Sequence, residues 1–316
     1  MSDSAWTDEL RFATDVARRA GALLLHHVDR LEQIDYKSKR DVVTNADYAS
    51  ERLVIDAIRA RYPDDAILAE ESGAAVGAGG EQRPSGRVWV IDPLDGTVNY
   101  ANGIPFYCVS IGLVVDDRPV VGVIFDPARD ELYDATADGP ARLDGEPVTA
   151  SAKQQLSDAV VSLTVIGKGG LMRERRIAPR IRIHRRMGSA ALALAYVANG
   201  RFDAFVQNGG LSAWDVAAAG LIAERGGAVA TDMTGASWWN PKLSAAGDAH
   251  APRHAVVAAP AVLHGPLMEL LGTVRMKAEL RREGAAPIAP QVPNVSTART
   301  AARTRATRRG GTATQG

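Results

Sequence analysis

At its centre the chain reads Val88-Trp-Val-Ile-Asp92-Pro-Leu-Asp95-Gly96-Thr97-Val-Asn99-Tyr100, an apolar run that ends in two carboxylates. Its first four residues are β-branched or aromatic, which predicts a short buried strand. Gly96 allows a tight turn, and Thr97 can begin a helix whose free N–H groups face the same place. Asp92 and Asp95 would then converge beside a helix N-terminus, where a divalent cation and a phosphate can bind together.

The same stretch also fits a simpler structure. A strand followed by an Asp-Pro turn would leave both carboxylates solvated, and short motifs of this kind often occur without any function. The stretch alone therefore leaves two alternatives, a metal site and a solvated turn. The other acidic residues of the chain help to decide between them.

Four further acidic residues lie at the ends or starts of predicted elements. Glu70 and Glu71 directly follow the short predicted strand Ala66–Ala69, and adjacent carboxylates repel each other unless solvent or a cation separates them. Asp47 and Asp215 lie in the first turns of two predicted helices, where a negative charge also favours the helix dipole. Capping and solvation explain each of these residues equally well, so none is decisive alone.

The spacing of apolar residues predicts a chain that mixes helices and strands. Helices are predicted at residues 7–31, 46–62, 188–200, 212–226 and 261–271, and an antiparallel meander of strands at 107–135. The glycines at 167–170 do not match the Gly-x-Gly-x-x-Gly pattern of dinucleotide-binding proteins, so no such cofactor is expected. From about Thr273 the chain is rich in Pro, Ala, Thr and Arg without an apolar period. We therefore predict a disordered basic tail at residues 273–316.

Composition and charge are those of an ordinary soluble protein with an uneven charge distribution. Of the 316 residues, 46% are hydrophobic and 23% are charged, and the formal net charge is zero. From Arg275 onward nine Lys or Arg stand against two Glu, a net of +7, so residues 1–274, with 28 positive and 35 negative charges, carry −7. An acidic body suits a cation-binding protein. The tail has no aromatic residue to stack on bases, so we interpret its charge as nonspecific.

Cysteine content and hydropathy indicate the compartment. The single cysteine, Cys108, excludes an internal disulfide and lies in an apolar run, which predicts a buried structural thiol in a reducing compartment. No apolar run approaches the roughly 20 residues needed to span a bilayer. The acidic N-terminus lacks the basic and apolar regions of a signal peptide. We therefore expect a cytoplasmic protein that does not bind a membrane.

Taken together, four motifs resemble the inositol monophosphatase family of magnesium-dependent, lithium-sensitive sugar phosphatases. They are Glu70-Glu71, Asp92-Pro-Leu-Asp95-Gly-Thr97, Gly188-Ser-Ala and Trp214-Asp215, and the resemblance covers about Leu10 to Leu271. It implies an α/β (α+β) fold, a five-layered α-β-α-β-α sandwich that forms one catalytic domain at residues 1–272 and is usually a homodimer. It also implies two or three Mg²⁺ ions as cofactors, in agreement with the preference of magnesium for hard oxygen ligands.

The resemblance assigns roles to individual residues. Its metal ligands fall on Glu70, Asp92, the carbonyl oxygen of Leu94, Asp95 and Asp215. Its water-activating residues fall on Glu71 and on Thr97, which is linked to Asp47. Its substrate-binding positions fall on Asp95, Gly96, Thr97, Gly188, Ser189, Ala190, Asn208 and Asp215, and Lys37 and Arg185 match two further basic residues. The metal would lower the pKa of the attacking water, while Thr97 and Glu71 orient it and accept its proton.

Two features depart from the pattern of inositol-specific members. Those members carry a glutamate seven residues before the aspartate of the Trp-Asp pair, where this chain has Asn208. An amide can both donate and accept hydrogen bonds, so hydroxyl binding is kept while selectivity is left open. The segment between Gly167 and Arg185 also looks shorter than in typical members. Both departures leave the identity of the alcohol that is released open.

These observations predict a phosphoric monoester hydrolase that cleaves inositol 1-phosphate or a similar small polyol or sugar phosphate. Histidinol phosphate, fructose 1,6-bisphosphate, nucleotide 3′-phosphates and NADP are alternative substrates for the same chemistry. A function of another class is also open, because some bacterial members act as accessory proteins in RNA-binding transcription complexes, and the basic tail would suit such a role. We expect the catalytic function, since a scaffold has no need of all these carboxylates.

Overall fold

In the computed structural model of the chain, the stretch that begins at Val88 lies in a strand of an eight-stranded sheet. Its strand order is β10-β9-β8-β7-β6-β5-β3-β4, with β3 and β5 parallel and the other neighbours antiparallel. The strands are β3 (Ala66–Ala69), β4 (Gly73–Ala75), β5 (Arg87–Asp95), β6 (Cys108–Val115), β7 (Arg118–Asp126), β8 (Glu131–Thr136), β9 (Arg142–Leu143) and β10 (Glu146–Pro147). The predicted meander is confirmed as β6, β7 and β8.

The structure describes residues 4–28, 34–38, 41–75, 86–167, 169–240 and 253–282, and only the backbone of 34–38, 41, 73–75 and 273–282. The chain divides into two units, Met1–Arg275 and Met276–Gly316, and the fold below is that of the first. None of the helices within the described ranges combines the length and the apolar composition that crossing a bilayer requires.

A second, five-stranded sheet has the order β12-β11-β13-β15-β14. Its strands are β11 (Val160–Thr164), β12 (Ile183–Arg185), β13 (Ala204–Leu211), β14 (Val229–Thr231) and β15 (His254–Ala259). The helices are α1 (Thr7–His27), α2 (Asn45–Arg61), α3 (Thr97–Ala101), α4 (Gly170–Ile177), α5 (Ala190–Ala195), α6 (Ala213–Arg225) and α7 (Ala261–Arg282). A separate hairpin joins β1 (Ile34–Ser38) to β2 (Asp41–Thr44), and two 3₁₀ turns lie at Leu156–Asp158 and Ala178–Arg180.

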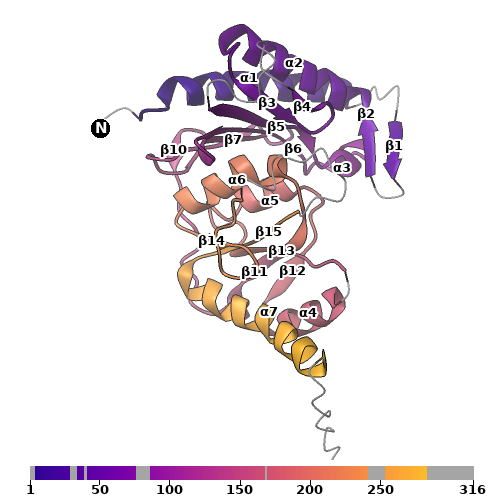
Figure 1. Ribbon diagram of the computed structural model, residues 1–316, viewed down its shortest axis with the longest axis vertical. Coiled ribbons are helices and arrows are strands. Elements are labelled where there is room, and N and C mark those ends of the chain that lie inside the picture. Colours follow the sequence, from indigo (N-terminus) through magenta and orange to yellow (C-terminus); the bar gives the residue numbers. More distant parts are fainter. Residues whose placement is uncertain are drawn as a thin grey trace, which may run out of the picture. The chain divides into compact units, whose positions relative to one another are not determined.

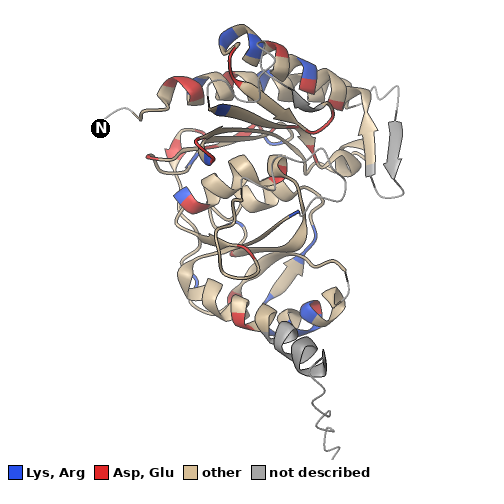
Figure 2. Ribbon diagram, viewed as in Figure 1, with Lys and Arg blue, Asp and Glu red and all other residues tan. Residues whose placement is uncertain are grey.

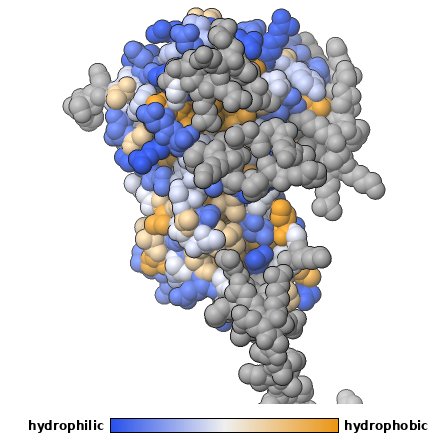
Figure 3. Space-filling model, in the orientation of Figure 1, coloured by the Kyte–Doolittle hydropathy of each residue, from blue (hydrophilic) through white to orange (hydrophobic). Residues whose placement is uncertain are grey.

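Three apolar cores stack these elements into layers (Figure 1). The first core joins α1 and α2 to one face of the larger sheet. The second fills the space between the two sheets and contains α5 and α6, and the third joins the far face of the smaller sheet to α4 and to α7. The predicted five-layered α-β-α-β-α sandwich is therefore confirmed. On the face drawn in Figure 3, hydrophilic and hydrophobic residues are intermixed over the described surface.

Helix α6 packs unusually close to the larger sheet. A Cβ atom added to Gly122 of β7 would lie 2.6 Å from the carbonyl oxygen of Ala218, and one added to Gly112 of β6 would lie 3.1 Å from the Cβ of Ala217. Two glycines on neighbouring strands therefore face alanines of the helix. Because a strand residue with a side chain would push the helix away, this pairing fixes the depth at which α6 lies between the sheets.

The structure corrects several predicted boundaries. Strand β5 does not stop at Ile91 but continues to Asp95, because Asp95 pairs with Cys108 of β6 after a register shift. Helix α1 ends at His27, before the predicted Leu31, and α5 is shorter than the predicted helix at 188–200. Helix α7 continues to Arg282, past the predicted end at Leu271 and into the first residues of the predicted tail. Residues 283–316 of the predicted tail lie outside the described residues.

The close packing of α6 against β7 predicts that an alanine in place of Gly122 destabilises the protein. Gly122→Ala should destabilise the protein by about 1–3 kcal/mol, because the added methyl meets the backbone of α6. Gly272→Ala is the matched control: its Cβ would meet no atom within 4 Å and it lies in α7, so the change should be neutral or stabilise by up to about 1 kcal/mol. Chemical denaturation measures both; equal effects would contradict the proposed packing.

Candidate active site

Three carboxylates meet where β5 ends and α6 begins. One oxygen each from Asp92, Asp95 and Asp215 lies within 4.8 Å of the other two. Asp92 is 1% exposed and Asp95 is 8% exposed, so water reaches these two side chains poorly. The central stretch therefore does not form a solvated turn, and the structure brings its two carboxylates together with a third from a position 120 residues later in the chain.

Each of these carboxylates is held by a backbone N–H group. Asp92 Oδ1 accepts a hydrogen bond from the N–H of Leu94 (3.1 Å), and Asp215 Oδ2 accepts one from the N–H of Ser212 (2.6 Å). Asp95 Oδ2 accepts two bonds of 2.6 Å, from the hydroxyl of Ser189 and the N–H of Ala191. These bonds fix the orientation of each carboxylate beside the other two.

Burial and mutual repulsion make the carboxylates difficult to ionise together. Burial raises the pKa of Asp92 well above its ordinary value, and the nearby charges of Glu70, Asp95 and Asp215 raise it further. The pKa of Asp215 is also raised, first by burial and then by Asp95 and Glu70. A divalent cation would remove both penalties, since it supplies the opposite charge and binds hard carboxylate oxygens. These residues therefore fit such an ion.

Helix α2 holds the central stretch from the other side. Thr44 and Asp47 form a capping box at its start, so Asp47 lies in the first turn of the helix, as predicted. The second oxygen of Asp47 accepts a hydrogen bond of 3.0 Å from the hydroxyl of Thr97, which also donates to the carbonyl oxygen of Leu94 at 3.0 Å. Ser50 donates to the carbonyl oxygen of Pro93 at 2.9 Å. The link between Thr97 and Asp47 that the resemblance implied is thus present.

Glu70 and Glu71 follow β3 at the edge of the cluster. Glu70 hydrogen-bonds with Asp92, which places its side chain beside the three carboxylates, although it is not one of the three with oxygens within 4.8 Å. The N–H of Glu71 donates to Glu51, a buried residue of α2, at 2.8 Å. Sequence analysis missed Glu51. Its position on the buried face of α2, in line with Ser50 and Val54, was the available signal.

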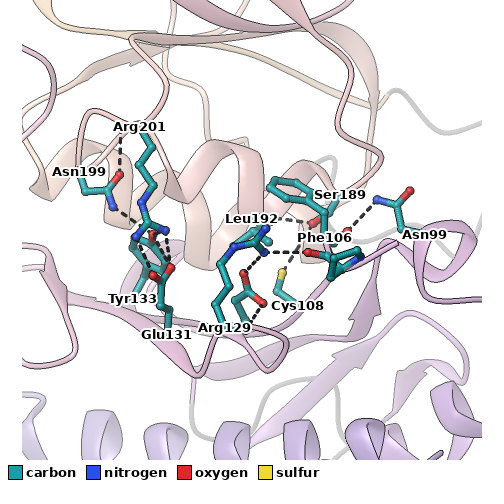
Figure 4. Close-up of polar contacts among 12 residues, drawn as sticks. Asn99, Phe106, Cys108, Arg129, Glu131, Tyr133, Ser189, Leu192, Asn199 and Arg201 are labelled. Carbon is teal, nitrogen blue, oxygen red and sulfur yellow. Dashed lines mark hydrogen bonds and ion pairs between the residues drawn. The ribbon is translucent and has the colours of Figure 1, made fainter. Parts of the chain in front are cut away.

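The loop at Gly188 to Ala190 faces the cluster through Ser189. Its hydroxyl caps α5 by accepting from the N–H of Leu192 at 3.3 Å while it donates to Asp95. The thiol of Cys108 lies 3.8 Å from the same hydroxyl, and Cys108 is fully buried, as predicted (Figure 4). Ser189 therefore has a structural partner on each side.

Asn99 was also missed by sequence analysis. Its amide donates to the carbonyl oxygens of Phe106 and Met187 at 2.7 Å each, and so joins α3 to the Gly188 loop (Figure 4). A Cβ on Gly188 would come within 2.7 Å of this amide, and Gly188 has a φ of +85°. Both observations require glycine at this position.

A cavity of about 300 Å³ opens beside the cluster. It is lined on one side by Asp95, Asp215 and the Gly188 to Ala190 loop, and on the other by side chains of the smaller sheet: Ser162, Thr164, Phe205 and Gln207. Asn208, the predicted hydroxyl-binding residue, does not line it. Its amide donates to and accepts from the backbone of Ile166 instead, at 3.1 and 2.7 Å. Its neighbour Gln207 occupies the cavity wall.

Comparison with known proteins identifies the family to which the chain belongs. The model of the inositol monophosphatase family matches residues 6–273. The chain belongs to the inositol monophosphatase family. Membership confirms the resemblance that the four motifs indicated, and the family is typically metal-dependent, in agreement with the acidic cluster.

Relatives within the inositol monophosphatase family carry two kinds of name. A Nus factor SuhB of Pasteurella multocida is 38% identical over 239 residues, 72% of this chain and 85% of that protein. Inositol monophosphatase 2 of Solanum lycopersicum is 35% identical over 72% of this chain and 88% of that one. Among solved structures, the extragenic suppressor protein suhB of Bartonella henselae superposes with a TM-score of 0.74 at 30% identity, covering 84% of this chain and 98% of that chain.

Two predicted basic residues of the inositol monophosphatase site are not placed in it by the described side chains. The side chain of Lys37 is outside the described residues, and Arg185 lies on the edge strand β12 with an exposed side chain. Arg253 was not predicted. Its guanidinium donates to the hydroxyl of Ser212, and its charge lowers the pKa of Asp215 in opposition to the larger effect of burial.

The acidic cluster predicts a pH-dependent stabilisation by metal. Because burial raises the pKa of Asp92, Asp95 and Asp215, the folded metal-free protein binds protons that the unfolded chain releases, so its stability falls as the pH rises above about 4. Mg²⁺ competes with those protons. At a hundredfold excess over its Kd it should add about 2.7 kcal/mol, with a larger increase in melting temperature at pH 8 than at pH 5.5.

Thermal unfolding with and without MgCl₂ at the two pH values measures this effect. NaCl of equal ionic strength is the control for screening. An equal rise with NaCl, or a rise that does not depend on pH, would contradict a cation site built from these three residues.

Proposed function

We propose that the protein is a Mg²⁺-dependent phosphomonoesterase that hydrolyses inositol 1-phosphate or a similar small polyol or sugar phosphate to the alcohol and inorganic phosphate. The observation that carries the proposal is the convergence of Asp92, Asp95 and Asp215 beside a cavity of about 300 Å³. Carboxylates and a cavity of this size fit a cation-bound phosphate ester. The wall of hydroxyl, amide and apolar side chains opposite fits a polyol.

Two or three Mg²⁺ ions would be held by Glu70, Asp92, the carbonyl oxygen of Leu94, Asp95 and Asp215. When bound, they supply charge that neutralises the phosphate oxygens and lowers the pKa of a water molecule. The N–H groups of Gly96 and Thr97, at the start of α3, hold the phosphate. Asp95 and Asp215 also face the cavity and bind substrate hydroxyls there.

Thr97 acts on the attacking water as an acceptor. Its single hydroxyl hydrogen is directed at Asp47 and the carbonyl oxygen of Leu94, so only its lone pairs face a water. A water that donates to Thr97 turns its own lone pair toward the phosphorus. Glu71, whose backbone is fixed by Glu51, accepts the proton that this water releases.

The alcohol that leaves is set by the loop Gly188 to Ala190 and by the sheet wall. Gln207, which lines the cavity, contacts the hydroxyl groups of this alcohol, while its neighbour Asn208 is bonded to the backbone of Ile166. Histidinol phosphate, nucleotide 3′-phosphates, fructose 1,6-bisphosphate and NADP are the alternative substrates. We further propose that the enzyme is lithium-sensitive, homodimeric and cytoplasmic.

A panel of phosphate esters and one isosteric variant test the proposal. The protein with Mg²⁺ should release phosphate from inositol 1-phosphate or one of the alternatives, and added LiCl should inhibit it. Asp95→Asn should lower kcat by about 10³-fold, because its amide oxygen can still accept from Ser189 and Ala191 while its NH₂ group cannot bind a cation. Phosphate release is measured, and circular dichroism checks the fold.

Asp15→Asn, an exposed change on α1, is the matched control for Asp95→Asn and should keep full activity. Near-normal turnover by Asp95→Asn would refute the assigned site. No release of phosphate from any ester in the panel would refute the enzymatic function itself.

A second candidate function is that of an accessory protein in an RNA-binding transcription complex. It is favoured by the relatives named Nus factor SuhB and by the basic C-terminal residues. Deletion of residues 283–316 keeps α7 and removes five Arg and one Glu. It should leave phosphatase activity within about twofold and weaken low-salt binding of a labelled RNA oligonucleotide, measured by fluorescence anisotropy. Equal RNA binding by both chains would contradict a role for the tail.

A further inference from the structure

We propose that Asn99 is a positioning residue that controls which alcohol the site accepts, because its side-chain amide holds the loop at Gly188 to Ala190 at a fixed distance from the phosphate position. This inference rests on the proposed phosphatase function and adds a residue that controls its selectivity. It follows from the hydrogen bonds that join α3, the segment after it and the loop (Figure 4).

The amide of Asn99 joins two backbone segments that lie far apart in the sequence. Its NH₂ group has two hydrogens, and both are used: one is donated to the carbonyl oxygen of Phe106 and the other to that of Met187, at 2.7 Å each. Asn99 is only 8% exposed, so water is a poor substitute for either bond. Loss of the amide would therefore release one segment from the other.

The Phe106 end of this link is held in place by an ion pair. Arg129 donates to the carbonyl oxygen of Pro105 at 2.8 Å, and its guanidinium lies 5.9 Å from the centre of the Phe106 ring. The same guanidinium pairs at 2.8 Å with Asp126, whose side chain is fully buried. Because Phe106 is itself buried, this end of the link is rigid. Asn99 therefore attaches the loop to a fixed part of the fold.

The other end of the link lies on the cavity wall. Four consecutive residues there line the cavity: Met187, Gly188, Ser189 and Ala190. Gly188 has a φ of +85°, and a Cβ atom added to it would come within 2.7 Å of both polar atoms of the Asn99 amide. The backbone of the loop therefore lies directly against this amide. A shift of the amide would move the cavity wall with it.

No ion pair can hold the two segments together. Residues 96–107 and 187–200 contain no Lys, Arg, Asp or Glu, and Figure 2 accordingly shows α3 and α5 in the colour of uncharged residues. The separation of the segments therefore depends on packing and on directed hydrogen bonds, which tolerate little change in length. Asn99 holds the start of the loop, and the bond between Ser189 and Asp95 holds its middle.

The position of the loop determines the room left for the alcohol. Thr97, two residues before Asn99, lies at the phosphate in the proposed function, and the alcohol lies between the loop and the wall that contains Ser162 and Phe205. The distance from the loop to this wall limits the width of the alcohol. Without the amide the loop is free to shift, so the site discriminates less between alcohols of different size, while the phosphate keeps its own contacts.

Two monophosphates of equal charge and different alcohol size test the inference. The wild-type protein should distinguish inositol 1-phosphate from glycerol 3-phosphate by kcat/KM, and Asn99→Ala should reduce this discrimination at least about fivefold, mainly through KM. The inhibition constant of inorganic phosphate should stay within about twofold, because the phosphate position is unaltered. Asn102→Ala is the matched control: its exposed amide donates to the carbonyl oxygen of Val98 in α3, so the change should keep the discrimination.

Gly188→Ala alters the same contact from the side of the loop. Its added methyl meets the amide of Asn99, so it should also reduce the discrimination. Combined with Asn99→Ala, which removes the atoms that the methyl meets, it should have a smaller effect. This variant tests the inference even if Asn99→Ala does not fold. Additive effects, or an unchanged ratio in either single variant, would overturn the inference and leave the phosphatase function standing.

Hydrogen exchange of the metal-free protein separates this inference from the proposed function, because it requires no turnover. The hydrogen-bonded N–H groups of Ala191 and Leu192, which follow the loop, should exchange at least about tenfold faster in Asn99→Ala than in Asn102→Ala, relative to the amides of α1 in the same protein. Equal exchange in the two variants would overturn the inference. Faster exchange in Asn99→Ala alone, without release of phosphate from any ester, would support the attachment of the loop and contradict the phosphatase function.

Discussion

Three carboxylates that are withdrawn from water repel one another, and the local structure around them opposes that repulsion. Asp92, Asp95 and Asp215 each have one oxygen fixed by a backbone N–H group, and for Asp95 a hydroxyl adds a second bond. These bonds hold the side chains in position while the cluster is uncompensated. The arrangement leaves an unfavourable electrostatic interaction that protonation or a bound cation would relieve, and it therefore suits a cation site better than a structural ion pair.

The stacking of the sheets and helices brings these three residues together. Asp92 and Asp95 come from the end of a central strand, and Asp215 comes from the first turn of a helix between the sheets. Their separation depends on how deeply α6 lies, and that depth is set by the contact of Gly112 and Gly122 with alanines of the helix. Packing of α6 on the neighbouring strands therefore helps to determine the geometry of the cluster.

Much of the fold and of the candidate cluster could be predicted from the sequence, because short motifs carried the chemistry. The central stretch, the capping box of Thr44 and Asp47, and the Trp-Asp pair all have local signatures. Glu51, Asn99 and Gln207 were missed because their roles depend on which distant backbone or cavity they face, and no local pattern encodes that. The continuation of β5 to Asp95 was missed because a register shift depends on the partner strand.

The hydroxyl of Ser189 couples the carboxylate cluster to the loop at Gly188 to Ala190. Its hydroxyl bonds to Asp95 on one side and caps α5 on the other, within the loop that borders the cavity. If Asp95 holds the proposed cation, an alcohol that shifts this loop would alter the support of that ligand, and a cation that shifts Asp95 would alter the loop. Thermodynamic linkage makes these effects reciprocal. Cation and alcohol would then bind with a single coupling free energy, transmitted through one hydroxyl group.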